Sequence, residues 1–182
     1  IGLLVVRGGT EVEPDIAARA AWVKQWTPVW TATWAAWALS SLSLLAFLIV
    51  WSERLVELGA ARMVTVGSCL VCAIGVVFDL CGETVNIVWL TRPDQTVAEF
   101  ARGARLYAIL GAGVANGLYC IAGFAISSVA WRVGHLRGWL GTLGFVMWTV
   151  GMSLTIVTIP DYRAGMIATG AGTMALFIPW VA

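Results

Sequence analysis

Two carboxylic acids and a carboxamide recur along one apolar stretch of the sequence with the spacing of a helix. They end a series at intervals of 3, 4, 3, 4 and 3 residues, in the order Cys69, Cys72, Val76, Asp79, Glu83 and Asn86. This alternation keeps side chains on one face of a helix in a left-handed bundle. Asp79, Glu83 and Asn86 therefore point the same way, and we call these three residues the acid seam.

The acid seam is costly inside a membrane. One charged side chain at mid-membrane costs about 2.5–3.5 kcal/mol on insertion scales, so two ionised acids would cost roughly 5–7 kcal/mol. No Lys or Arg lies within any long apolar stretch to pair with Asp79 or Glu83. We therefore expect both acids to face the bundle interior and to be protonated, bound to a cation or hydrated.

Three roles are open for the acid seam. Asp79 and Glu83 could exchange protons or bind a cation, with Asn86 and Tyr119 as polar neighbours. They could instead form a neutral pair whose hydrogen bonds fix the register of neighbouring helices. A catalytic role is the third, but no catalytic residue is predicted, because the sequence contains no P-loop, nucleophile elbow or HExxH motif.

Tryptophan is unusually frequent, at 11 of 182 residues. Trp22 and Trp26 suit the aromatic belt at a membrane interface. Trp30, Trp34 and Trp37 continue the same helical spacing toward the membrane interior. These three predict either packing within the protein or an aromatic wall against a lipid, quinone, carotenoid or partner subunit.

Small residues are concentrated in the second half of the sequence. Gly113, Gly117 and Gly123 have the spacing that lets helix backbones approach closely in lipid, so we expect them to support helix packing.

Metal and haem sites are not expected. Cys69 and Cys72 have metal-ligand spacing, but Cys81 and Cys120 do not supply a second close pair. The cysteines lie in apolar runs and are expected to act as small packing residues, which argues against zinc. His135 is the only histidine, which argues against haem held by several histidines.

Composition indicates an integral membrane protein. The chain is 60% apolar and 12% charged, whereas soluble domains are about 45–50% apolar and about 25% charged. The formal net charge of +1 gives no basic field for a nucleic-acid partner. Two-residue alternation is missing, which argues against a β-barrel.

We predict an all-α fold, a polytopic helical bundle with about five transmembrane helices and short loops. The predicted spans are residues 28–51, 63–90, 107–131, 140–159 and 164–180. Residues 28–182 form one domain, and residues 1–27 form a juxtamembrane segment with a possible interfacial helix. The apolar residues at both ends leave room for one further span outside this sequence.

Three local signals divide the spans. Pro93 follows the second span and cannot continue a helix. Thr96 and Glu99 have capping-box spacing and should start the next helix. The tight link at residues 160–163 predicts that the last two helices are antiparallel neighbours.

The distribution of positive charge predicts the orientation. Seven Lys and Arg residues fall on the side of the N-terminal segment and four on the other side. This excess favours a cytoplasmic N-terminus in an inner or plasma membrane.

Two functions follow. The sequence favours a non-catalytic membrane subunit or scaffold that packs against lipids, other membrane subunits or a second copy of itself. The alternative is a small proton- or cation-coupled transporter or sensor that uses Asp79 and Glu83. Co-purifying subunits or a pigment spectrum would favour the scaffold, and ion-dependent or pH-dependent stability would favour the transporter or sensor.

Overall fold

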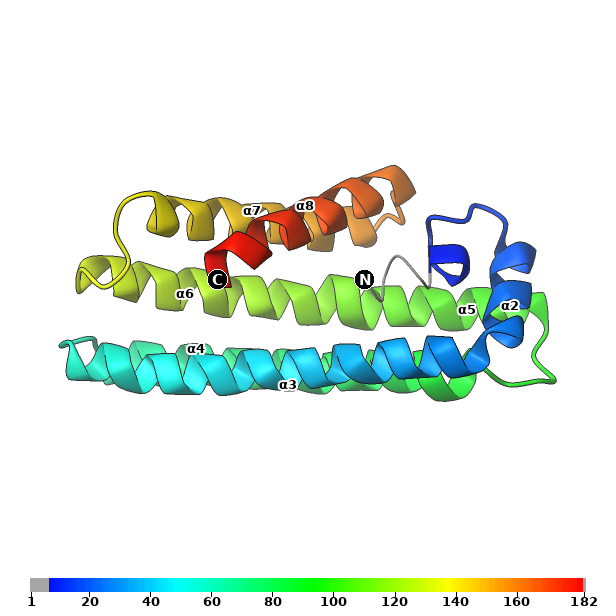
Figure 1. The fold of residues 1–182 in the computed structure, drawn as a ribbon, viewed down its shortest axis with the longest axis horizontal. Coiled ribbons are helices and arrows are strands. Elements are labelled where there is room, and N and C mark those ends of the chain that lie inside the picture. Colours follow the sequence, from blue (N-terminus) through cyan, green and yellow to red (C-terminus); the bar gives the residue numbers. More distant parts are fainter. Residues whose placement is uncertain (1–6, 182) are drawn as a thin grey trace.

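The computed structural model describes residues 7–181, which form helices joined by turns, without a strand in this range. The all-α class is confirmed (Figure 1). A short 3₁₀ turn, η1, and two π-helical segments, η2 and η3, accompany seven α-helices in these residues. The elements are η1 (Arg7–Gly9), α2 (Ile16–Gln25), α3 (Thr27–Glu57), α4 (Arg62–Thr84), η2 (Val85–Trp89), α5 (Val97–Ala108), η3 (Ile109–Ala115), α6 (Asn116–Arg132), α7 (Trp139–Thr158) and α8 (Arg163–Val181).

Four helical stretches in the described residues are long and apolar enough to cross a membrane. They are Thr27–Glu57, Arg62–Trp89, Val97–Arg132 and Trp139–Thr158. The prediction of about five spans was therefore one too many. Residues 164–180 do lie in a helix, α8, but it is not among the four.

The third predicted span, 107–131, covers about the last two thirds of a longer helical stretch, Val97–Arg132. The helix starts at Val97, because Thr96 and Glu99 form the predicted capping box. The backbone N–H of Glu99 donates to Thr96 Oγ1 at 3.3 Å, and the backbone N–H of Thr96 donates to Glu99 Oε2 at 2.9 Å. The first turns are less apolar, so hydropathy alone missed them, but Phe100 is buried against other helices.

Three long helical rods form the body of the bundle. α3, α4 and the continuous α5–η3–α6 rod run along the long axis (Figure 1). α4 packs against both other rods, α7 packs against α6 and η3, and α8 packs against α7. The antiparallel arrangement of α7 and α8 is as predicted from their short link.

Apolar side chains gather in two clusters at different levels of the bundle. One cluster joins α3, α6 and α7 to α8 and includes Leu48, Ile126 and Trp148. The other joins α2, α3 and α5 and includes Trp30 and Phe100. The polar acid seam lies on α4 and η2, between Cys72, which belongs to the first cluster, and Leu90, which belongs to the second. The outer faces expose large apolar side chains, as a lipid-facing surface does.

Helix α2 and the turn before it close one end of the bundle (Figure 1). Lys24 Nζ donates to the carbonyl of Gln95 at 3.0 Å. The Arg163 guanidinium donates to the backbone carbonyls of residues 11 and 12. Arg19 donates to the Gly9 carbonyl, and burial lowers the pKa of its guanidinium, with nearby Glu11 opposing the shift. The segments predicted to share one membrane side therefore contact one another.

Candidate functional site

The acid seam lies inside the bundle. Asp79, Glu83 and Asn86 are 4%, 2% and 0% exposed, whereas Val77 and Val88 on other faces of the same rod are 60% and 62% exposed. The spacing of the sequence predicts this difference, because positions three and four residues apart share a helix face. Two carboxyl groups are thus removed from both lipid and bulk water.

Asp79 sits where three helices meet. Tyr119 of α6 donates its hydroxyl to Asp79 Oδ2 at 3.2 Å. The Ser41 hydroxyl of α3 donates to the Ala38 carbonyl at 2.9 Å and lies near both of these side chains. Gly75, one turn before Asp79, makes room for the tyrosine ring, since a Cβ there would lie 2.8 Å from Tyr119 Cε1. The carboxyl group therefore accepts from one neutral hydroxyl and has a second hydroxyl, from another helix, close by.

Glu83 has a different environment. Asn86 Nδ2 donates to Glu83 Oε2 at 3.4 Å, and the Tyr107 hydroxyl of α5 interacts with the Asn86 side chain. Glu83 Oε1 and Asn86 Oδ1 are buried without a hydrogen-bond partner. Among the described residues, no salt bridge involves Asp79 or Glu83. A buried acceptor left unpaired costs about 1–3 kcal/mol, so these two oxygens call for a proton, a water molecule or a cation.

The π-helical segment η2 begins at Val85 and contains Asn86, the last residue of the acid seam. In an α-helix the N–H of Leu90 would donate to the carbonyl of Asn86, but here it donates to Val85 at 2.9 Å. The released Asn86 carbonyl accepts the Trp30 indole N–H of α3 at 2.9 Å. The wide turn is therefore held open by a hydrogen bond from another helix.

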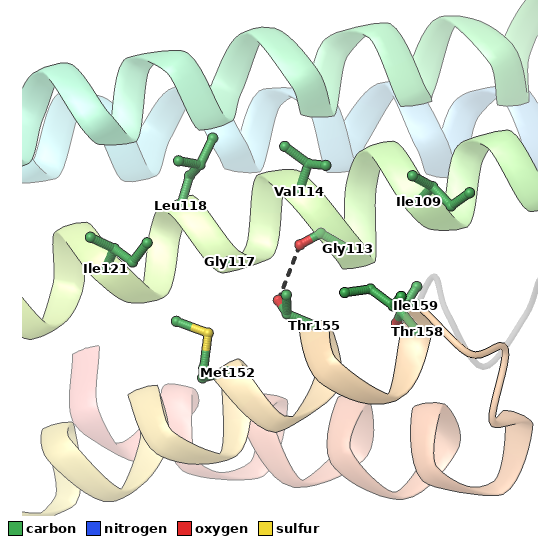
Figure 2. A pocket seen from close by; sticks show the side chains of 10 residues that line it. All are labelled: Ile109, Gly113, Val114, Gly117, Leu118, Ile121, Met152, Thr155, Thr158 and Ile159. Atoms are coloured by element: carbon green, nitrogen blue, oxygen red, sulfur yellow. Dashed lines mark hydrogen bonds between the residues drawn. The ribbon is translucent and has the colours of Figure 1, made fainter.

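The second π-helical segment, η3, is held in the same manner. The backbone N–H of Asn116 donates to Gly111 and Gly113, which leaves the Ala112 carbonyl without its α-helical donor. The Thr155 hydroxyl of α7 lies 3.1 Å from the Gly113 carbonyl (Figure 2). It also lies 3.4 Å from the Ala112 carbonyl.

Asn116 completes this second network. Its Nδ2 donates to Thr155 Oγ1 at 3.0 Å and to the Gly151 carbonyl at 2.6 Å. On another face of η3, a Cβ on Gly111 would lie 3.6 Å from Asp79 Oδ1. The segment η3 thus lies between the acid seam and α7. Single-turn π segments occur frequently at functional sites in proteins.

The predicted tryptophan face turns into the protein. Trp30 and Trp34 are 2% and 3% exposed, and Trp37 is partly buried. The ring centroids of Trp30 and Trp34 are 5.4 Å apart, and those of Trp34 and Tyr107 are 5.0 Å apart. The tryptophan rings therefore extend to Tyr107 beside the acid seam, and the lipid, quinone, carotenoid or partner contact remains a prediction.

The three predicted packing glycines, one in η3 and two in α6, face α7. A Cβ on Gly123 would come within 2.2 Å of Trp148 Cε2, and one on Gly117 within 3.2 Å of Thr155 Cγ2. Gly113 and Gly117 line an apolar groove of about 290 Å³ between the α6 rod and α7 (Figure 2). The absence of a side chain at these glycines lets α7 approach closely.

Sequence reasoning missed four of the polar residues described above. Ser41, Tyr107, Asn116 and Thr155 contact the acid seam or η3 from neighbouring elements. Nothing in their spacing along the chain marked them, because each belongs to a different helical rod or faces a different neighbour.

No group of three or more His, Cys, Asp or Glu in residues 7–181 could hold a metal ion. Comparison with protein-family models, with curated proteins and with solved structures found no match to this chain.

Proposed function

We propose that this chain is a small proton- or cation-coupled membrane transporter or sensor, and that Asp79 and Glu83 take up and release the coupling charge. The observation that carries the proposal is the burial of two acids without a basic partner, next to acceptor oxygens that have no donor. A structural acid pair needs its hydrogen bonds complete. This pair is incomplete on the Glu83 side, where an exchangeable proton or ion supplies the missing partner.

Asn86 is suited to both protonation states of Glu83. Its amide group presents its NH2 donor to an ionised carboxylate. When the amide flips about its side-chain bond, it presents its oxygen acceptor to a protonated carboxyl group. Donor and acceptor occupy nearly the same space, so Glu83 can change its charge without repacking its surroundings. The two neighbouring tyrosines, Tyr107 and Tyr119, can likewise donate or accept through their hydroxyl groups.

The contacts of the predicted interaction faces support this function over a scaffold. The glycine and tryptophan faces were the basis for a subunit that binds partners. Trp30, Trp34 and Gly123 make their contacts within the chain. An intramembrane acid pair, by contrast, is costly to maintain, and such residues commonly mark ion or proton paths.

The orientation belongs to the same proposal. We place the N-terminal segment in the cytoplasm, across an inner or plasma membrane, because of the seven to four distribution of Lys and Arg. Lys24 is the one lysine of the sequence and its residue is exposed. Modification of Lys24 by a membrane-impermeant amine reagent in intact cells would contradict this orientation.

Tryptophan fluorescence provides a test of the acid pair, since Trp30 donates to the Asn86 carbonyl beside it. The purified protein should show a pH-dependent fluorescence transition in mild detergent. Asp79→Asn and Glu83→Gln should each shift or abolish it, and the double variant should lack it. Glu53→Gln is the matched control, because Glu53 is exposed at the far end of α3.

A double variant that titrates like the wild-type protein would overturn the proposal. Reconstituted vesicles with a pH-sensitive dye inside then separate the two forms of the function. A transporter changes the internal pH when a gradient is applied, whereas a sensor shows the fluorescence transition without proton flux.

A further inference from the structure

We infer that Glu83 and Asn86 bind one small desolvated monovalent cation of the sodium class, in exchange with a proton. This inference rests on the proposed function and assigns the ligand of the same site. Its starting point is the pair of unpartnered oxygens, Glu83 Oε1 and Asn86 Oδ1, in side chains that are 2% and 0% exposed.

The two acids divide into a fixed and an exchanging group. Asp79 receives the Tyr119 hydroxyl at 3.2 Å, and the Ser41 hydroxyl lies near it. Glu83 has the Asn86 amide alone, at the long distance of 3.4 Å, and one oxygen without a partner. Because like charges close together in a medium of low polarity oppose double ionisation, one proton stays on the pair. The single remaining negative charge is balanced by an ion of charge +1.

The available ligands favour a hard cation. Carboxylate, amide and hydroxyl oxygens from Glu83, Asn86 and Tyr107 are the kinds of ligand that alkali and alkaline-earth ions prefer. The described residues bring no third His, Cys, Asp or Glu to this place, as a high-affinity divalent site would need. The composition of the site therefore suits a monovalent ion.

Close packing around the site favours a small ion over an organic cation. A Cβ on Gly82 would lie 3.4 Å from Tyr107 Cδ2, and a Cβ on Gly111 would lie 3.2 Å from Tyr107 Cε2. The segments α4 and η3 therefore approach each other to within contact of the tyrosine ring. A sodium-sized ion can be held between oxygens at such a place, whereas an amine with carbon substituents needs a cavity.

The charged and titratable groups facing Glu83 contain no competing cation among the described residues. α4 supplies Asp79 and α5 supplies Tyr107, and Tyr119 of α6 donates its hydroxyl to Asp79. The α3 side chains here are neutral, namely Ser41, Trp30 and Trp34. Every ionisable group in this set is acidic, so an added cation is attracted and a proton competes with it.

The experiment compares sodium with choline at fixed pH and constant ionic strength. In mild detergent, replacing choline chloride by sodium chloride should change the fluorescence of the wild-type protein saturably and raise its unfolding temperature. Potassium should act more weakly. Because one proton competes with one ion, the apparent Kd for sodium should rise about tenfold for each unit by which the pH is lowered below the titration midpoint.

Variants distinguish the role of Glu83 in sodium binding from that of Asp79. Glu83→Gln should abolish the sodium effect because it removes the negative charge. Asn86→Leu should weaken the effect at least about tenfold because it removes an oxygen ligand. Asp79→Asn should keep sodium binding, because it imitates the protonated acid, and Glu53→Gln should bind like the wild type. Far-UV circular dichroism and gel filtration check that each variant is folded.

Each result tests either the assignment of the cation to Glu83 and Asn86 or the proposed function of the chain. A wild-type protein that responds to pH but not to sodium overturns the cation assignment and leaves the proton function standing. A wild-type protein that responds to neither overturns the proposed function as well. A sodium effect that survives in folded Glu83→Gln moves the ion to another site and overturns the assignment. If Glu83→Gln does not fold, Asn86→Leu and the wild-type comparison still decide.

Discussion

Thr155→Val should loosen η3 by removing one hydroxyl group at nearly constant volume. The Thr155 hydroxyl serves the Gly113 carbonyl at 3.1 Å and the Ala112 carbonyl at 3.4 Å, and it accepts from Asn116 Nδ2 at 3.0 Å. Asn116 keeps its other bond, to the Gly151 carbonyl at 2.6 Å. The main loss is thus the donor to the η3 carbonyls.

The magnitude follows from two limits. A single hydrogen bond between membrane helices contributes about 0.6 kcal/mol on average and at most about 1.7 kcal/mol. A buried carbonyl left without any donor costs about 1–3 kcal/mol. Thr155 is partly buried and its hydroxyl lies within hydrogen-bond distance of two carbonyls. We therefore expect a loss of about 1–2 kcal/mol in the free energy of unfolding.

Unfolding by sodium dodecyl sulfate in mixed micelles, followed by tryptophan fluorescence, measures this loss. Thr155→Ser keeps the hydroxyl and should lie closer to the wild type. Thr149→Val is the matched control on the same helix, because the exposed Thr149 hydroxyl bonds only to the Phe145 carbonyl one turn back. If Thr155→Val and Thr149→Val were equally stable, the account of η3 as a segment anchored by α7 would be refuted.

Two further predictions concern packing and the other π-helical segment. Gly123→Ala should destabilise the protein by about 1–3 kcal/mol, because its methyl group would overlap the buried Trp148 ring. Gly170→Ala, with open space around the position, should instead stabilise it by about 0.5–1 kcal/mol. Trp30→Phe should cost about 2–4 kcal/mol, through a cavity and an unpaired η2 carbonyl. Trp139→Phe, 67% exposed, should be nearly neutral, and thermal unfolding of the four variants compares them.

Part of the site was predictable from local patterns. The 3-4 spacing placed Asp79, Glu83 and Asn86 on one buried face, since helix geometry fixes which side chains share a direction. The capping pair Thr96 and Glu99 marked the start of a helix that hydropathy alone placed ten residues later. These features depend on residues close together in the chain, so a single sequence contains them.

The partners of the acid seam were not predictable in this manner. Ser41 and Tyr107 reach it from other helices, 38 residues before Asp79 and 24 residues after Glu83 in the sequence. No periodicity within one helix states which face of a neighbour it will meet. The π-helical segments were equally hidden, because each is held by a donor from a distant helix, Trp30 or Thr155.

Composition, apolar run lengths and helical spacing were sufficient to predict a membrane helical bundle with an inward-facing acid pair. These properties follow from the cost of exposing polar groups to lipid and from the geometry of a single helix. The partners of each acid and the oxygens without donors were decided only by the tertiary structure. They depend on how the helices rotate and approach one another, and that is set by side-chain packing between segments far apart in the chain.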